Sequence, residues 1–379
     1  MRINRLGILA AVVTGAVALT ACGSDSNGSS SGGSTTTSAG GSSSSSSSSG
    51  SANCGSGALK AEGSTAQKNA MDQWIKDYQN ACSGATVTYN GTGSGAGVTN
   101  FIAKQDDFAG SDSALDPSKN EVADAAKSCG SPALDIPMVV GPIAAAYKVN
   151  GVTDLTLTPK VLTQIFLGKI KTWNDPAIKA INSSANLPST AITVFYRSDS
   201  SGTTQNFEKY LAANDPTDFT SKPDKDSSKA GFAGQGKSGS QGVQQAISST
   251  DGSIGYVEWS FAVSGNLDTA KIDNGSGAVE LNADSAGAAV AAATVASNGG
   301  QDLTLKLDYA TKASGAYPII LVTYEIVCSK YSDSAKGSAV KSFLTYTSNQ
   351  GQSSLKDLGY APLPTEILTK VQAAVASIS

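Results

Sequence analysis

One short segment, residues 197–203, combines the residue types that bind an anion. It begins with Arg197, whose planar guanidinium carries several N–H donors. Asp199 follows two residues later, where its carboxylate can orient that guanidinium. The segment follows an apolar run at residues 192–196 and precedes a predicted helix beginning near Gln205. Backbone N–H groups at a helix N-terminus attract negative charge, so three more residues add donors: Ser201, Gly202 and Thr203. The same residues are also ordinary helix N-caps, so this segment alone leaves both interpretations open.

Three further turns of small polar residues follow predicted strands. Two lie at residues 62–66 and 91–97 and lead into predicted helices, and the third ends the short predicted strand at residues 108–112. In open α/β sheets, ligands bind outside the carboxyl ends of the strands, at turns of this kind. Each turn alone is weak evidence, because Gly and Ser are common in any loop. Together with the segment at 197–203, they give four candidate loops for one oxyanion.

The N-terminal segment is typical of an exported lipoprotein. Arg2 and Arg5 precede a mostly apolar stretch at residues 6–19, and small residues stand just before Cys22. The apolar stretch is too short for a transmembrane helix, so we expect a signal peptide over residues 1–21 and a lipid on Cys22. The following Ser- and Gly-rich segment, residues 22–53, cannot bury a core and is expected to be a flexible tether.

Charge and cysteine content exclude several classes of function. Without the two signal-peptide arginines the chain has 25 basic and 31 acidic residues, a net charge of −6, which argues against nucleic acid as a partner. Four cysteines remain beyond the lipidation site, and outside the cytoplasm they predict two disulfides with three possible connectivities. The chain contains no His, so we expect no zinc site.

Short apolar runs alternate with helical patterns from residue 58 onward, which predicts an α/β protein. Two longer apolar runs, residues 136–149 and 317–328, stand apart. Prolines inside the first exclude a regular helix, so we expect both runs to be connectors between two lobes.

The four loops, in this order and spacing, resemble the PstS family of phosphate-binding proteins of bacterial ABC importers. The likeness extends from about Leu59 to the C-terminus. It rests on six motifs at residues 63–65, 91–98, 107–112, 168–173, 197–203 and 253–258. The resemblance implies a two-lobed type II periplasmic-binding-protein fold, with residues 54–145 and 316–379 in lobe I, residues 146–315 in lobe II, and two hinge strands between them.

The resemblance also implies which residues bind phosphate: Ser64, Thr65, Ala66, Ser94, Asp112, Arg197, Ser201, Gly202 and Thr203. Asp199 is expected to orient Arg197. Ala66 departs from the Phe or Leu of several relatives, which matters little if only its backbone N–H is used. Asp112 can only accept hydrogen bonds when ionised, so it would favour phosphate, which keeps a proton near neutral pH, over sulfate, which does not. The implied fold pairs Cys129 with Cys328 and Cys54 with Cys82.

The family implies inorganic phosphate as ligand, permease subunits of an ABC importer as partners, and no cofactor or catalytic activity. We expect a monomer attached by its lipid to the outer face of the cytoplasmic membrane.

Three alternatives compete with this hypothesis. Residues 231–238 match the P-loop pattern G-x-x-x-x-G-K-[ST], but a polar segment precedes them where a P-loop requires a buried strand. An exported phosphate-ester hydrolase would need Ser94 or Ser201 as nucleophile, but without His the usual relay cannot form. A binding protein for sulfate, molybdate or phosphonate would share the fold, so only the site can distinguish it.

Overall fold

The computed structural model describes residues 54–291, 293–296 and 300–379. The expected signal peptide, the tether and the lipidation site Cys22 lie outside the described residues. Within the described part of the chain, no helix is both long enough and apolar enough to cross a membrane.

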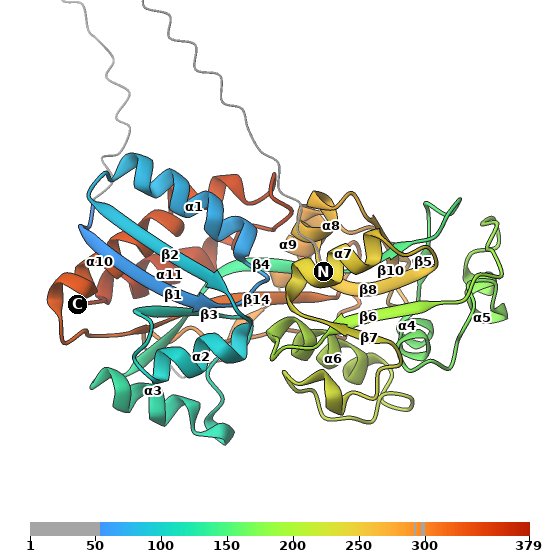
Figure 1. Ribbon diagram of the computed structural model, residues 1–379, viewed down its shortest axis with the longest axis horizontal. Coiled ribbons are helices and arrows are strands. Elements are labelled where there is room, and N and C mark those ends of the chain that lie inside the picture. The colour runs from blue at the N-terminus through green and yellow to red at the C-terminus, as the bar shows by residue number, and fades with distance from the viewer. Residues whose placement is uncertain (1–53, 292, 297–299) are drawn as a thin grey trace, which may run out of the picture. The chain divides into compact units, whose positions relative to one another are not determined.

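A nine-stranded mixed sheet runs through the described chain (Figure 1). Its strand order is β2-β1-β3-β14-β4-β8-β6-β7, with β9 paired to β4. These strands are β1 (Gly57–Gly63), β2 (Ala85–Gly91), β3 (Phe108–Ser111), β4 (Ala133–Lys148), β6 (Thr193–Arg197), β7 (Gln235–Lys237), β8 (Ser253–Glu258), β9 (Asp268–Thr269) and β14 (Ile320–Cys328). Two small sheets join β5 (Thr156–Leu157), β10 (Lys271–Asp273) and β11 (Ala278–Val279), and β12 (Thr294–Val295) with β13 (Leu305–Lys306).

Helices alternate with the strands, as the sequence predicts for an α/β protein. They are α1 (Lys68–Ala81), α2 (Ser94–Ile102), α3 (Glu121–Cys129), α4 (Pro159–Phe166), α5 (Pro176–Ile181), α6 (Gly202–Asn214), α7 (Gly239–Ser248), α8 (Trp259–Ser264), α9 (Ala283–Ala291), α10 (Ser334–Thr347) and α11 (Thr365–Ser377). Three short 3₁₀ helices lie at η1 (Pro117–Lys119), η2 (Ser227–Lys229) and η3 (Gln350–Ser354).

Two large hydrophobic cores divide the molecule into a first and a second lobe. Trp74, Phe108 and Phe343 lie in the first core, and Trp173 and Phe207 lie in the second, all fully buried. In Figure 1 the first lobe carries α1, α2 and α10, and the second carries α4 and α6 to α8. The core of the first lobe also includes buried residues of α9 and β13, a segment that the predicted division assigns to lobe II. The exact lobe boundaries therefore stay a prediction.

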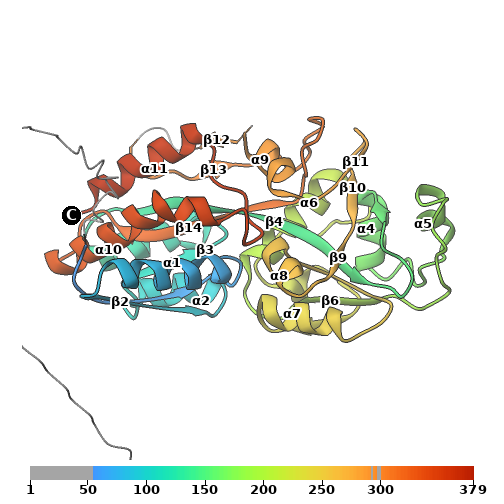
Figure 2. The ribbon, with the colours of Figure 1, turned by 90° about the horizontal axis from the view of Figure 1, so that it is seen from above.

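The two long apolar runs form β4 and β14, which pair antiparallel and lie side by side between the lobes (Figure 2). The first part of β4 pairs with β14, whereas its last six residues pair with β8 of the second lobe. Pro137 stands where the pairing register shifts, opposite Tyr324. A proline lacks the N–H that a ladder needs, so a bulge tolerates it better than a regular pair does.

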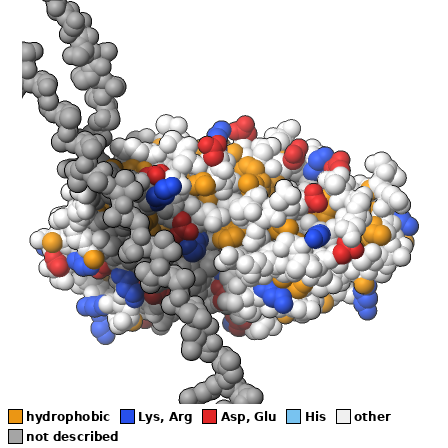
Figure 3. All heavy atoms as spheres, turned by 45° about the horizontal axis from the view of Figure 1, so that its top comes forward, with side chains coloured by type: hydrophobic (Ala, Val, Ile, Leu, Met, Phe, Trp, Pro, Cys, Tyr) orange, Lys and Arg blue, Asp and Glu red, His pale blue; other side chains and the backbone are white. Residues whose placement is uncertain are grey.

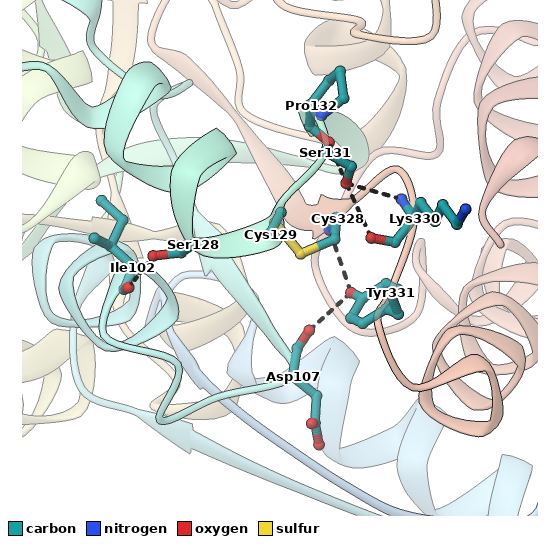
Figure 4. The surroundings of a disulfide bond; sticks show 9 residues. All are labelled: Ile102, Asp107, Ser128, Cys129, Ser131, Pro132, Cys328, Lys330 and Tyr331. Atoms are coloured by element: carbon teal, nitrogen blue, oxygen red, sulfur yellow. Dashed lines mark hydrogen bonds between the residues drawn. A yellow bond between two sulfur atoms is a disulfide. The ribbon is translucent and has the colours of Figure 1, made fainter.

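Two disulfides join Cys54 to Cys82 and Cys129 to Cys328, the pairing that the resemblance implies. The second links the end of α3 to the end of β14 (Figure 4). Beside it, the Tyr331 hydroxyl donates to the backbone carbonyl of Asp107 at 2.8 Å. This region therefore anchors the return strand β14 firmly in the first lobe.

Candidate functional site

The candidate loops meet because parallel strands end at the same edge of a sheet. β1 and β3 are parallel neighbours, and they end just before Ser64 and Asp112. In the second lobe, β6 ends at Arg197 and α6 begins at Gly202. Hydrogen bonds between the two lobes bring these ends together. The Ser94 hydroxyl at the start of α2 accepts from the Gly202 N–H at 3.2 Å.

The Asp112 carboxylate is the centre of the first lobe's contribution. It is buried, and its Oδ1 accepts hydrogen bonds from the hydroxyls of Ser64 at 2.5 Å and Thr323 at 2.8 Å. Its Oδ2 accepts from the Ser94 hydroxyl at 3.1 Å. Three hydroxyls thus fix the orientation of a carboxylate that has no basic partner among these contacts.

Burial raises the pKa of Asp112 from 3.8 to about 6, an effect to which the nearby Glu258 adds. The hydroxyls of Ser64, Thr323 and Ser94 work in the opposite direction, because they donate to the ionised form. The carboxylate therefore titrates close to neutral pH, where it can share a proton with a bound anion that carries one.

The Arg197 guanidinium is the charged donor of the second lobe. It is only 1% exposed, and its Nε donates to Asp199 Oδ1 at 2.7 Å, while its Nη2 pairs with Asp199 Oδ2. Although burial opposes ionisation of both groups, the contact with Arg197 lowers the pKa of Asp199 and Asp199 raises the pKa of Arg197. The expected orienting pair is thus present as a bidentate ion pair.

Ser240 connects Arg197 to the first lobe. Arg197 Nη1 donates to the Ser240 hydroxyl at 3.2 Å, and that hydroxyl lies 2.7 Å from the Thr65 hydroxyl. Thr65 belongs to the turn after β1, whereas Ser240 lies in the first turn of α7. The chain of polar contacts therefore runs from one lobe to the other.

Two glycines allow the loops of the two lobes to approach this closely. A Cβ on Gly202 would stand 2.6 Å from the Asp112 Cβ and 2.8 Å from the Ser94 hydroxyl. A Cβ on Gly93, whose φ is +98°, would stand 2.7 Å from an Asp199 carboxylate oxygen. Neither approach is compatible with a larger side chain, so the site requires glycine at both positions.

The remaining expected residues lie at the same place but several have local partners. The Ser201 hydroxyl caps α6 by accepting from the Thr204 N–H at 3.3 Å. The Thr203 hydroxyl donates to the Glu258 carboxylate. The Ala66 N–H donates to the Ser64 hydroxyl at 3.0 Å. The structure thus brings all nine expected residues and Asp199 into one region, although the Thr203 hydroxyl contacts Glu258.

Sequence reasoning missed three residues of this cluster: Thr323, Ser240 and Glu258. Thr323 and Glu325 interrupt an otherwise apolar strand, and a polar residue in a buried strand is a signal that could have indicated a partner. Glu258 ends the motif at residues 253–258, and nothing in that motif indicates its contact with Thr203. For Ser240, a serine in a Gly-rich segment, no signal in the sequence distinguishes it from an ordinary loop residue.

The P-loop match does not form a phosphate cradle. Its second half, Gln235–Lys237, is the edge strand β7, and α7 begins only at Gly239. In a true P-loop the glycine-rich turn follows a buried strand and leads directly into a helix. Among the described residues, no cluster of three or more His, Cys, Asp or Glu side chains is arranged to hold a metal ion.

Known proteins resemble this chain in sequence and in structure. A family model described as a PBP superfamily domain matches residues 31–350. The phosphate-binding protein PstS 3 of Mycobacterium tuberculosis is 44% identical over 385 residues, which cover 100% of both chains. The phosphate-binding protein PstS of Xylella fastidiosa is 32% identical over 310 residues, covering 81% of this chain and 82% of the relative.

A solved structure of a high affinity periplasmic phosphate-binding protein bound with phosphate matches with a TM-score of 0.69. The match covers 84% of this chain and 93% of that chain at 22% identity, so it shows that the two share a fold. The fold and the family model together define a two-lobed, type II periplasmic binding protein. Within that class, the chain belongs to the PstS family of phosphate-binding proteins. The predicted family and fold class are therefore confirmed.

Proposed function

We propose that this protein captures inorganic phosphate between its two lobes and delivers it to an ABC importer. The observation that carries the proposal is that hydrogen bonds between the lobes join the loops around a buried carboxylate, Asp112, to the loops around a buried arginine, Arg197. Arg197 supplies the positive charge, and Asp112 supplies an acceptor for a proton that the ligand brings. The names of the relatives, phosphate-binding proteins of the PstS type, agree with this assignment.

Most of the remaining phosphate ligands are neutral donors. Hydroxyls and backbone N–H groups can surround an oxyanion without the desolvation cost of further buried charges. We assign this role to residues at the strand ends and at the starts of α2 and α6: Ser64, Thr65, Ala66, Ser94, Ser201, Gly202 and Thr203. Several of these groups have partners in this structure, so we expect their hydrogen bonds to be exchanged for bonds to phosphate on binding.

Selection against sulfate follows from Asp112. Phosphate still carries a proton near neutral pH and can donate it to the carboxylate, whereas sulfate has none to donate. Two anionic acceptors would then face each other without a proton between them, which is costly in a buried site.

We assign the protein no catalytic activity and no cofactor. The sequence contains no His, so the usual Ser-His-Asp relay cannot be built on Ser94 or Ser201. Acidic and basic side chains are interspersed on the face that Figure 3 displays, as suits a protein that does not bind nucleic acid.

The remaining assignments concern the cell. We propose that the chain is a monomer on the outer face of the cytoplasmic membrane, attached through a lipid on Cys22, and that permease subunits of the importer recognise the closed lobes. Closure would distinguish the loaded from the empty protein, with β4 and β14 as the hinge.

Equilibrium dialysis with radiolabelled phosphate tests the proposal. The purified full chain, stripped of bound ligand, is expected to retain one phosphate per molecule, and it should not hydrolyse a chromogenic phosphate ester. Failure to retain phosphate would contradict the binding role, whereas steady release of the chromophore would indicate a hydrolase.

A further inference from the structure

A cavity lies between the two lobes, beside the proposed phosphate site, with which it shares Asp112. Its volume is about 380 Å³, whereas one water takes about 30 Å³ of liquid, so a ligand of several non-hydrogen atoms fits. Its wall on the first lobe is formed by residues 112–114, 116, 117 and 119, by β14, and by residues 304–307 in and around β13. Its wall on the second lobe is formed by α6 and Lys225. Of the proposed phosphate ligands, Asp112 is the one that also lines this cavity.

Four lysines line the cavity: Lys119, Lys209, Lys225 and Lys306. The lining contains two carboxylates, Asp112 and Asp116, so the wall has an excess of positive charge in a protein whose net charge is negative. An excess of cations around a partly enclosed cavity concentrates anions there.

Lys225 carries the strongest signal. The residue is 5% exposed, and its buried Nζ has no hydrogen-bond partner among the described residues. Its ion pair with Glu121 Oε1 spans 3.8 Å, which is beyond hydrogen-bond distance. A buried ammonium without an acceptor is costly, and an anion in the cavity would supply the missing acceptor.

Lys209 faces the same cavity from α6. Burial lowers its pKa, and the positive charge of Lys225 lowers it further, while Asp116 acts in the opposite direction. The structure gives the Lys209 ammonium no ion pair or hydrogen bond among the described residues. Two ammonium groups therefore repel each other here, and a multivalent anion between them would relieve that repulsion.

The neighbouring carboxylates are already engaged elsewhere. Asp116 accepts from the Ser118 N–H at 2.8 Å and from its hydroxyl at 2.7 Å, and Glu121 accepts from the Asp116 N–H at 2.8 Å. Asp224 pairs with Lys119 at 3.5 Å and with Lys229 at 3.3 Å. Asp112 accepts from three hydroxyls at the phosphate site. Lys209 therefore has no ion pair among the described residues, and Lys225 has Glu121 Oε1 at 3.8 Å, beyond hydrogen-bond distance.

We propose that this lysine-lined cavity is a second anion site, which takes a multivalent phosphate anion while the first site holds inorganic phosphate. Lysine ammoniums bind phosphate as point charges with three donors each, so they suit an anion rich in acceptor oxygens. Two sources share this chemistry, a condensed phosphate such as pyrophosphate and a second free phosphate ion.

Calorimetric titration of the full chain tests the proposal. The protein is first saturated with inorganic phosphate and then titrated with pyrophosphate in one arm and with more phosphate in the other. We expect one further equivalent of pyrophosphate to bind, with an affinity that falls as salt is added. The variants Lys209→Met and Lys225→Met should each weaken this second event about tenfold or more, because each removes one charged donor.

Lys179→Met, an exposed lysine of α5, is the matched control and should leave both events unchanged. Because Lys209 is only partly buried, its variant is informative even if the Lys225 variant does not fold. A lysine-dependent second event with phosphate alone would also support the site and identify the free ion as its ligand. Absence of any second event in either arm, or one that neither variant weakens, would overturn the proposal. The first titration with phosphate reports the proposed function separately.

Discussion

Replacing Asp112 with Asn should change how the stability of the ligand-free protein depends on pH. In the folded protein this carboxyl has a pKa of about 6, compared with 3.8 for an ordinary Asp. Between these two pH values the folded state holds a proton that the unfolded state has already released. The free energy of unfolding therefore falls as pH rises through this window, by about 3 kcal/mol in total, because each pH unit of difference is worth about 1.4 kcal/mol. The Asn variant lacks this contribution.

Urea unfolding of the ligand-free wild type and of the Asp112→Asn variant, from about pH 4 to about pH 7, measures the effect. As pH rises over this range, the free energy of unfolding of the wild type should fall by about 2 to 3 kcal/mol relative to that of the variant. Other buried carboxyls with raised pKa values that do not depend on Asp112, such as Asp135 and Glu208, are present in both proteins, so their contributions largely cancel. Asp72→Asn, on the exposed face of α1, is the control and should keep the wild-type slope. If the free energies of unfolding of wild type and Asp112→Asn depend on pH in the same way, burial does not raise the pKa of Asp112 and the reasoning is refuted.

Three further substitutions test the site and the fold. Arg197→Lys keeps the charge but loses the planar fork, so phosphate affinity measured by calorimetry should fall about 10- to 100-fold, and an unchanged affinity would count against the arginine's role. Gly202→Ala places a Cβ 2.6 Å from the Asp112 Cβ, so the two loops must move apart. The affinity for phosphate should then fall about tenfold or more, and wild-type affinity would show that the closed site tolerates the methyl group. A variant with Ser at both Cys129 and Cys328 lacks the disulfide that closes a loop of 199 residues. Its free energy of unfolding in urea should be lower by about 2–5 kcal/mol, whereas an unchanged urea midpoint and slope would show that the disulfide does not stabilise the fold.

The candidate site residues could be picked out in the sequence because they follow strands and begin helices, and their role in binding stays a prediction. Ser64, Asp112 and Arg197 each come at or directly after the end of a strand, where local pattern and the geometry of open sheets agree. The α/β class and the two connecting strands could be predicted for the same reason. Prolines excluded a helix in residues 136–149, so this run was expected to connect the lobes, and its bulge is seen only in its pairing with β14.

The rest of the site depends on contacts between residues far apart in the chain. Thr323 reaches Asp112 across 211 residues, and Ser240 reaches Thr65 across 175, and no local pattern encodes such pairs. Helix boundaries were displaced for a related reason. The alanine-rich pattern of residues 288–296 is typical of a helix, but the helix here, α9, spans Ala283–Ala291, and β12 (Thr294–Val295) follows it. Alanine suits a helix at either position, so packing and strand pairing decide where the helix ends.

The most direct test of the central claim is to titrate the ligand-free full chain with phosphate and, separately, with sulfate at neutral pH. The arrangement of Arg197 and Asp112 predicts tight one-to-one binding of phosphate and no measurable response to sulfate. Equal binding of the two anions would contradict the role assigned to the Asp112 carboxylate, and failure to bind phosphate would contradict the proposed function itself.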